Sequence, residues 1–473
     1  MQDLIHKNLY LLYLKTLSYG IAQVLYVLLS IALLTYLLFS LSTTEFGTYS
    51  LARVAPMLLI PLISINLNTS LIRFYQEWKK SKIVGSSIYT VLITQFIWLF
   101  ISLPIIFLFA ETIYGFLFTK IDYFPLIFLA IIAEILVIPS LYIRDFYNAK
   151  EQSIKYAAVL NIHFILILFF VFYFVSSEQS ALSAIKGYLF GNLFFAVVSL
   201  FLLFINIKKK FNQKIALEVL RFSLPTVPET SINYVMMSID RIFIDKFFDL
   251  KTIGIYSFAR SLIQILNPIA RTFKTSFIPY YYKIINEKLF KIEVIKSFYL
   301  FNLIILLFIS IISLYIENIL FIFENKDYQG SSALIFLLGI YLYLDSIVLV
   351  NYFLIQSTSK TEYLLIGYIV KLTSFLFPIF SILWLNWPIT IYSFTLIYIF
   401  SNTLYLVYLE TTKSIIRNLD YKLFFNITYS LLIFSLISVS ISLSFEFEWI
   451  YKLFIIFFQI ILLYNAITPM FKR

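Results

Sequence analysis

Long apolar runs follow one another along nearly the whole of this 473-residue chain. A run of about 20 apolar residues can cross the hydrocarbon layer of a membrane, roughly 30 Å thick, as one α-helix. The runs are continuous, whereas the strands of a membrane barrel alternate between apolar and polar residues. The sequence therefore predicts an all-α polytopic membrane protein.

The positions of the apolar runs predict about fourteen transmembrane helices. The first six cover residues 9–41, 49–72, 84–109, 123–142, 157–175 and 181–207. The next six cover residues 222–247, 254–278, 297–314, 331–356, 363–385 and 388–409. Two extra C-terminal helices are expected at residues 423–445 and 449–467.

The chain contains an internal repeat. Residues 47–73 (GTYSLARVAPMLLIPLISINLNTSLIR) align with residues 254–279 (GIYSFARSLIQILNPIARTFKTSFIP), so that Gly47, Arg53 and Pro61 fall on Gly254, Arg260 and Pro268 after a shift of 207 positions. The same shift carries each of the first six spans onto its counterpart. Because six is an even number, both units have the same orientation, and we expect two parallel six-helix repeats.

The repeat also predicts the domains. We expect an N-terminal six-helix lobe at residues 1–207, a cytoplasmic linker at 208–221, a C-terminal six-helix lobe at 222–412 and two additional transmembrane helices within 413–473. Pro61 and Pro268, which are equivalent in the repeat, are each expected to bend a helix because proline removes a backbone hydrogen bond.

Basic residues collect in the loops on one side of the predicted bundle. The sparsely charged side has only Lys120, Lys246, Lys251, Lys326 and Lys452. By the positive-inside rule, both termini are cytoplasmic. The richness in Ile, Lys, Phe and Tyr suggests a bacterial genome, so we expect a multi-pass protein of the bacterial cytoplasmic (inner) membrane. The loop lysines and arginines account for the net charge of +11, and no nucleic-acid partner is expected.

Signatures of enzymes are missing from the sequence. We find no phosphate loop, no HExxH and no Gly-rich dinucleotide turn, and the chain has no cysteine. The predicted loops are too short for a catalytic domain, which argues against a membrane glycosyltransferase or polymerase. We therefore expect a protein that is not an enzyme and that holds no cofactor or metal.

Charged residues inside the predicted spans are the best candidates for function, because an ionisable group in lipid is costly unless it faces a cavity or a partner. They are Lys15, Arg53, Glu134, Lys186, Asp240, Arg241, Arg260, Arg271, Lys274, Asp345 and Lys371. The eight bases outnumber the three acids, so internal pairing cannot neutralise them all, but a bound anion could. The alternative is that Lys15, Arg53, Lys186 and Lys274, which lie near span ends, reach the membrane interface.

One polar stripe extends this pattern through a whole predicted helix. Arg260, Gln264, Asn267, Arg271 and Lys274 are spaced by four, three, four and three residues, which places them on one helical face. With Arg53, Lys15 and Lys371, these residues are the candidate substrate-binding residues for an anionic ligand.

The acidic residues are candidates for ion coupling. Glu134 and Asp345 lie near span centres, where they could carry a proton or form a salt bridge to Lys371 or Arg260. Glu229 and Asp240 lie eleven positions apart on one face and form a second candidate path for a cation. His163 is expected to be a packed or interfacial histidine.

Several stretches resemble a known family. TTEFGTYSLAR and SLIRFYQE in the first half, with RFSLPTVPETSINYVMMSIDRIFIDKF, IGIYSFAR and IPYYY in the second, resemble the polysaccharide flippases. These include the O-antigen (Wzx) flippases of the multidrug, oligosaccharidyl-lipid and polysaccharide (MOP) exporter superfamily. The resemblance covers most of residues 1–420. It implies two six-helix lobes in a V around a cavity, and alternating access that moves an undecaprenyl-diphosphate-linked oligosaccharide from the inner to the outer leaflet.

The resemblance also implies partners and alternatives. Cationic cavity residues would hold the diphosphate and anionic sugars, and H⁺ or Na⁺ is a possible coupling ion. Membrane lipids and glycan polymerase or ligase machinery are further expected partners. Fourteen spans resemble the lipid II flippases, whose extra helices shape a groove for a lipid tail. A multidrug antiporter of the same superfamily is the other alternative, for which a cation-rich cavity has the wrong sign.

Overall fold

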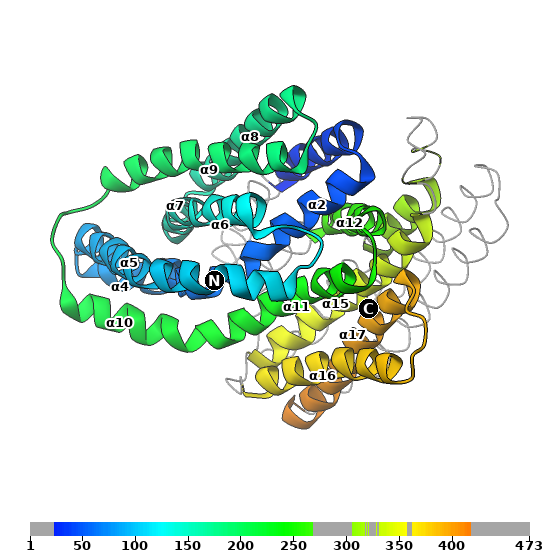
Figure 1. The fold of residues 1–473 in the computed structure, drawn as a ribbon. Coiled ribbons are helices and arrows are strands. Elements are labelled where there is room, and N and C mark those ends of the chain that lie inside the picture. The colour runs from blue at the N-terminus through cyan, green and yellow to red at the C-terminus, as the bar shows by residue number, and fades with distance from the viewer. Residues whose placement is uncertain are drawn as a thin grey trace, which may run out of the picture. The chain divides into compact units, whose positions relative to one another are not determined.

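The computed structural model describes residues 23–267, 305–316, 318, 320, 328, 331–356 and 362–417, and every regular element among them is a helix (Figure 1). This confirms the predicted all-α class. The predicted C-terminal helices at residues 423–445 and 449–467 lie outside the described residues. Contacts divide the chain into two compact units, residues 1–254 and 255–473.

The first unit is built from helices that mostly follow the predicted spans. Helix Gln23–Ser40 comes first. It is followed by α2 (Thr43–Val54), η1 (Ala55–Leu58), α3 (Ile60–Ser64), α4 (Leu67–Lys80), α5 (Val84–Leu117), η2 (Tyr123–Ile127), α6 (Phe128–Ile135), α7 (Ile138–Ala149), α8 (Ser153–Ser177), α9 (Ala181–Phe204), α10 (Gln213–Ser223), η3 (Leu224–Thr226), α11 (Val227–Phe247) and the start of α12 (Leu250–Gln264). Helix α10 begins within the predicted linker, residues 208–221, and ends two residues beyond it.

The second unit contains the rest of α12 and the helices of the second repeat. Its described helices are Ile305–Ile316, α15 (Ser332–Gln356), α16 (Glu362–Trp384) and α17 (Ile391–Arg417). Helix α17 packs against both α15 and α16.

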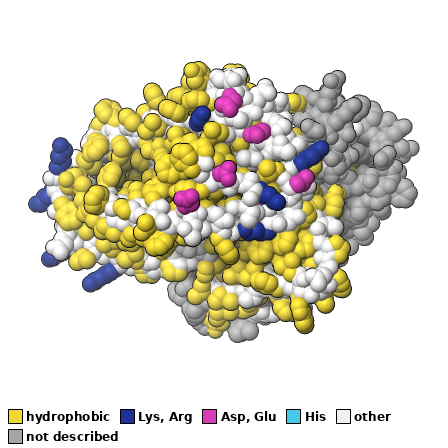
Figure 2. Space-filling view, viewed as in Figure 1, with side chains coloured by type: hydrophobic (Ala, Val, Ile, Leu, Met, Phe, Trp, Pro, Cys, Tyr) yellow, Lys and Arg dark blue, Asp and Glu magenta, His cyan; other side chains and the backbone are white. Residues whose placement is uncertain are grey.

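Eight described helices are long and apolar enough to cross a membrane. Their outward faces carry large apolar side chains, including Phe100, Phe116 and Trp384, which are 84%, 79% and 86% exposed. Figure 2 shows apolar side chains over most of one face, which is the surface expected of a protein that contacts lipid. Helix α11 is also long enough, but it carries Asp240, Arg241 and Asp245 inside the protein and falls outside this group.

The loops of the first unit gather at two ends, as the span alternation predicts. At one end, the Lys208 backbone N–H donates to the Gly85 carbonyl at 3.0 Å, and Lys150 Nζ lies 3.3 Å from Asn206 Oδ1. The loops at this end, residues 81–83, 150–152 and 205–212, carry Lys82, Lys150, Lys208, Lys209 and Lys210. At the other end, the Ala181 backbone N–H donates to Glu45 Oε2 at 2.6 Å.

Close packing of α8 on α9 depends on two glycines. A Cβ atom at Gly187 would lie 2.4 Å from the Val171 Cα, and one at Gly191 would lie 2.7 Å from the Ile167 Cα. The GxxxG spacing therefore brings two helices of one chain together.

The spans predicted as single helices at residues 49–72 and 123–142 are broken in the structure. The first divides at η1, beside Pro56 and Pro61, and again at Ile65 and Asn66, whose φ angles are 41° and 54°. The second divides between α6 and α7, two residues before Pro139. Proline lacks the N–H that would continue the helix, which explains the proline breaks.

The predicted polar stripe is also interrupted. Helix α12 ends at Gln264, and the Ile265 and Leu266 N–H groups bond three residues back, to Leu262 and Ile263. Pro268 has no N–H to donate to the Gln264 carbonyl, just as Pro61 has none in the first repeat, where α2 ends slightly earlier, at Val54. The expectation of one continuous helix across residues 254–278 was wrong at this point. Only Arg260 and Gln264 of the stripe lie on α12; Arg271 and Lys274 lie outside the described residues.

Candidate functional site

Arg53 lies in the last turn of α2, immediately before the helix break. Its Nη1 donates to Glu134 Oε2 at 3.4 Å, and its Cζ lies 4.0 Å from the centroid of the Tyr188 ring on α9. The Tyr49 hydroxyl donates to the Tyr188 hydroxyl at 3.1 Å. From the sequence we expected Lys371 or Arg260 as the salt-bridge partner of Glu134 or Asp345. In the structure, the partner of Glu134 is Arg53. The guanidinium is thus held by a carboxylate and a ring inside the first unit, and 26% of the Arg53 side chain is exposed.

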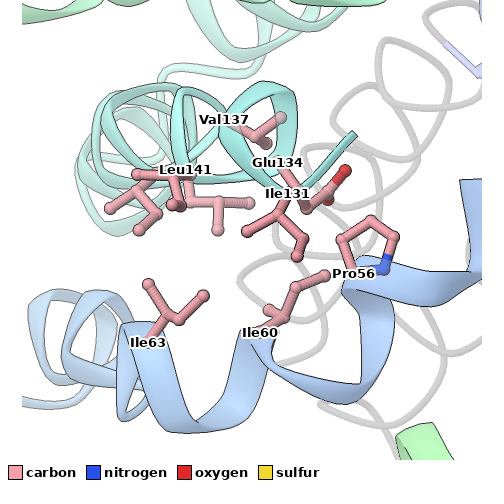
Figure 3. Close-up of a pocket in the computed structure, with 9 residues that line it drawn as sticks. Pro56, Ile60, Ile63, Ile131, Glu134, Val137 and Leu141 are labelled. Atoms are coloured by element: carbon pink, nitrogen blue, oxygen red, sulfur yellow. The ribbon is translucent and has the colours of Figure 1, made fainter. Parts of the chain in front are cut away.

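A pocket lies between the two helix breaks of the first unit (Figure 3). The cavity has a volume of about 20 Å³, which is room for about one water molecule, and it is partly open. It is lined by Pro56, Ile60, Ile63, Ile131, Glu134, Ile135, Val137, Ile138 and Leu141. Glu134 lies at one end beside Pro56, and Ile63 and Leu141 lie at the other (Figure 3). Glu134, which pairs with Arg53, is thus the one carboxylate in the apolar lining of this pocket between the two helix breaks.

A second cluster lies in the second unit, around Arg260. This arginine is 5% exposed, and its Nη2 donates to the Tyr398 hydroxyl at 3.2 Å. Its Cζ lies 5.0 Å from the Tyr341 ring centroid and 5.2 Å from that of Tyr398. The two rings stack on each other at 4.2 Å. Two aromatic faces therefore support one buried guanidinium.

Lys371 joins the same cluster from α16. Its Nζ lies 3.5 Å from Asp345 Oδ1 and donates to the Tyr341 hydroxyl at 3.4 Å. It also lies 5.4 Å from the ring centroids of Tyr341 and Tyr405. The side chain of Asp345 is 46% exposed, whereas that of Lys371 is 5% exposed. The sequence left open whether Asp345 carries a proton or forms a salt bridge. The structure shows a salt bridge to Lys371.

The two clusters repeat each other in their construction. Arg53 and Arg260 are equivalent under the 207-residue shift, and each stacks on a tyrosine of the sixth predicted span of its repeat, Tyr188 on α9 and Tyr398 on α17. The same shift carries Glu134 onto Tyr341, so the side chain opposite the arginine is an acid in one unit and a phenol in the other. The duplication seen in the sequence is therefore present in the packing around the arginines.

The structure places the other predicted residues as follows. Asp240 is buried, and its Oδ1 accepts the backbone N–H of Arg241 at 2.9 Å. Gln264 and Asn267 are partly buried, and Glu229 lies on α11. His163 stacks on Phe195 and bonds to Asn192 at 2.9 Å, which confirms a packed histidine. Lys15 lies outside the described residues.

Sequence reasoning missed the tyrosines that surround the cations. They are Tyr49, Tyr188, Tyr341, Tyr398 and Tyr405. The repeat could have indicated one of them, since Glu134 plus the shift of 207 gives Tyr341. Within the described residues, no group of three His, Asp or Glu side chains could hold a metal ion.

An all-helical, multi-pass chain with cations buried beside broken helices has the build of a flippase-type membrane transporter. Residues 12–285 match the family described as polysaccharide biosynthesis protein, and the chain belongs to this family. The match covers more than half of the chain and confirms the resemblance to the polysaccharide flippases.

Solved structures of transporters have the same fold. The lipid II flippase MurJ in an inward closed conformation matches with a TM-score of 0.68 and 15% identity, over 98% of this chain and 100% of MurJ. An inward-facing multidrug resistance MATE transporter of the MOP superfamily matches with a TM-score of 0.52 and 12% identity, over 86% of this chain and 96% of that chain. A MATE structure in complex with MaD3S matches with a TM-score of 0.54 and 12% identity, over 86% and 97%. No curated protein compared with the chain matches it.

Proposed function

We propose that this protein is a flippase that moves an undecaprenyl-diphosphate-linked oligosaccharide, such as an O-antigen, capsule or exopolysaccharide repeat unit, from the inner to the outer leaflet of the bacterial cytoplasmic membrane. Membership of the polysaccharide biosynthesis family supports a glycan cargo. In this proposal the protein works by alternating access, without covalent chemistry. Both termini lie in the cytoplasm.

The observation that carries this proposal is the pair of buried cations around Tyr341. Arg260 and Lys371 lie against the same ring, in the interior of a membrane-spanning unit. The two cations repel each other; Asp345, 3.5 Å from Lys371, offsets part of this repulsion, and an anion that binds both cations would offset more of it. A diphosphate supplies oxygens that match a guanidinium fork, and the stacked tyrosines offer flat faces against which a sugar can pack.

Arg53 and Glu134 provide a means of coupling. While Glu134 is ionised it holds Arg53 at 3.4 Å. When Glu134 gains a proton, the attraction is lost and Arg53 becomes available to the anionic cargo. Asp345, Asp240 and Glu229 are the other proposed ion-coupling residues, and H⁺ or Na⁺ is the proposed ion. The remaining substrate-binding residues, Lys15, Gln264, Asn267, Arg271 and Lys274, keep their predicted role in this proposal.

A lipid II flippase is the second candidate. It is favoured by the match of the fold to MurJ over 98% of this chain. In both cases the cargo is a glycan on a lipid diphosphate, so the two candidates share the anion site and differ in the sugar.

Reconstitution into liposomes tests the function. The expected result is that the purified protein moves a lipid-linked oligosaccharide between leaflets and that Arg260→Ala slows this movement. Losing a charge-assisted hydrogen bond of about 1.5–3 kcal/mol corresponds to roughly a tenfold to hundredfold reduction. Arg73→Ala is the matched control, since Arg73 pairs with Glu77 on the surface and more than half of each side chain is exposed. Equal rates for Arg260→Ala and the unmodified protein would contradict the proposal.

A further inference from the structure

A side chain of α9 supports the break between α6 and α7. The Val137 N–H, which would bond to the Ala133 carbonyl in a continuous helix, donates instead to the Glu134 carbonyl at 3.1 Å. The Ala133 carbonyl accepts the side-chain amide of Asn192 at 2.8 Å. The break therefore leaves one carbonyl to a side chain, and this carbonyl belongs to the residue before Glu134.

His163 on α8 fixes the orientation of that amide. Its Nε2 lies 2.9 Å from Asn192 Oδ1. Because the Asn192 nitrogen donates to Ala133, its oxygen accepts, so Nε2 of His163 carries the hydrogen of this bond. The His163 ring also stacks on Phe195, with the ring centroids 4.5 Å apart, and His163 and Asn192 are both buried. The two side chains thus form a buried chain of hydrogen bonds that ends at the break.

The second unit contains the same construction, with Lys371 in the place of His163. One face of α9 and one face of α17 carry corresponding residues under a single shift of 210 positions, Tyr188, Asn192 and Phe195 on α9 and Tyr398, Asn402 and Tyr405 on α17. Asn402 donates to the Tyr341 carbonyl at 3.3 Å. Lys371 Nζ lies 5.4 Å from the ring centroid of Tyr405, the counterpart of Phe195. His163 and Lys371 therefore hold equivalent positions, and Lys371 belongs to the proposed anion site.

We propose that His163 is a positioning residue for Glu134, and through Glu134 for Arg53. Its N–H holds the Asn192 amide in the one orientation that bonds to the Ala133 carbonyl. That bond fixes the end of α6 from which Glu134 reaches Arg53 at 3.4 Å. An amide that is not held can rotate, and the carbonyl at the break then loses its partner. The positioning itself needs no cargo, and only its part in ion coupling rests on the proposed function.

Two substitutions separate the hydrogen bond of His163 from its packing. His163→Phe keeps a ring against Phe195 but has no N–H for Asn192, whereas His163→Gln keeps an N–H donor and has no ring. The measurement is amide hydrogen exchange of the detergent-solubilised protein, followed in peptides that cover residues 136–141. The loss of one hydrogen bond should make exchange there about tenfold faster in His163→Phe, and His163→Gln should leave it unchanged. The opposite order, or equal exchange in the two variants, would overturn the proposal.

Asn192→Leu tests the same bond from its other side. Leucine is similar in size to asparagine but cannot donate to the Ala133 carbonyl, so exchange at residues 136–141 should rise as it does in His163→Phe. Peptides from α5 serve as the reference, because none of these hydrogen bonds involves α5, and their exchange should be the same in every variant. Unchanged exchange at the break in Asn192→Leu would show that the Ala133 carbonyl does not depend on this amide.

Transport in proteoliposomes then tests the part of His163 in coupling. His163→Phe is expected to lose the dependence of translocation on a proton gradient, and His163→Gln is expected to keep it. Adding Glu134→Gln to His163→Phe should change nothing further, because both substitutions act on the same ion pair. A gradient dependence kept by His163→Phe would overturn the positioning of Glu134 by His163. If the unmodified protein shows no gradient dependence, the proposed coupling fails, and hydrogen exchange alone decides the positioning.

Discussion

At the scale of single residues, this protein is distinguished by arginines and a lysine held against tyrosine rings inside a membrane-spanning chain. Arg53 lies 4.0 Å from the Tyr188 ring, and Arg260 lies about 5 Å from two rings. A tyrosine face stabilises a cation without cancelling its charge, whereas a carboxylate forms an ion pair. The side chain opposite each arginine therefore decides how that arginine can respond to an anion.

Exchanging the two opposing side chains tests this division. Tyr341→Glu places in the second unit the acid that Glu134 provides in the first, and we expect it to pair with Arg260 and weaken binding of an isoprenoid diphosphate about tenfold or more. Tyr341→Phe is the control, since it keeps the ring beside Arg260. The measurement is a titration of the detergent-solubilised protein with the lipid diphosphate. Equal affinities for the two variants would show that position 341 does not control the anion.

Glu134→Gln tests whether the first unit senses protons. An amide cannot ionise, so Arg53 should stay released from its partner at every pH. We expect translocation by the unmodified protein to depend on a proton gradient and translocation by Glu134→Gln to lose that dependence. The measurement is transport with and without an imposed pH difference, and a gradient dependence preserved in Glu134→Gln would assign coupling to another acid.

At the scale of elements, broken helices position the candidate site. The break at η1 and the break between α6 and α7 line one pocket, and Arg53 and Glu134 lie beside them. Breaks leave backbone groups unpaired within the helix, so they persist inside a membrane only where a cavity or another polar group can satisfy them. The unbroken α8 and α9, by contrast, form a rigid pair packed through glycines.

Gly187→Ala is expected to loosen that pair. The added Cβ would lie 2.4 Å from the Val171 Cα, and overpacking of this kind costs about 1–3 kcal/mol. The measurement is the apparent unfolding temperature in detergent, which should fall for Gly187→Ala and stay unchanged for Gly115→Ala, where the new methyl group meets no atom within 4 Å. An unchanged unfolding temperature for Gly187→Ala would mean that α8 can shift without loss of packing.

At the scale of the whole molecule, duplication explains why both units contain the same arrangement. Asn192 donates from its side-chain amide to the Ala133 carbonyl, and Asn402 donates to the Tyr341 carbonyl. These pairs are related by shifts of 208 to 210 residues, close to the 207 found between the repeat segments. Each unit therefore keeps the same interior contacts although the sequences have diverged.

The orientation in the membrane is a prediction at this scale. Single cysteines replacing the exposed Lys209 and Lys120 should be labelled from opposite sides, Lys209→Cys from the cytoplasm and Lys120→Cys from the outside. The measurement is labelling of intact cells with an impermeant thiol reagent, compared with permeabilised cells. Labelling of Lys209→Cys in intact cells would reverse the predicted topology.

Much of the architecture was predictable because the bilayer imposes simple rules on the chain. Apolar runs located most spans of the first unit, and the proline positions indicated bends near Pro61 and Pro268. The second break of the same span, at Ile65 and Asn66, was missed, because no proline or glycine marks it. The polar stripe beyond Arg260 was predicted on the assumption of a continuous helix. The break before Pro268 interrupts that helix, and so the stripe.

By itself the sequence determined the all-α class, the duplication and the excess of positive charge within the spans. Hydrophobicity, spacing and charge are local properties of the chain, and the bilayer constrains each segment through them. The tertiary structure decided which groups meet. Tyr188 reaches Arg53 across 135 positions, and Asp245 reaches Thr119 across 126. Such contacts depend on how helices pack and where they break, and no local pattern encodes them.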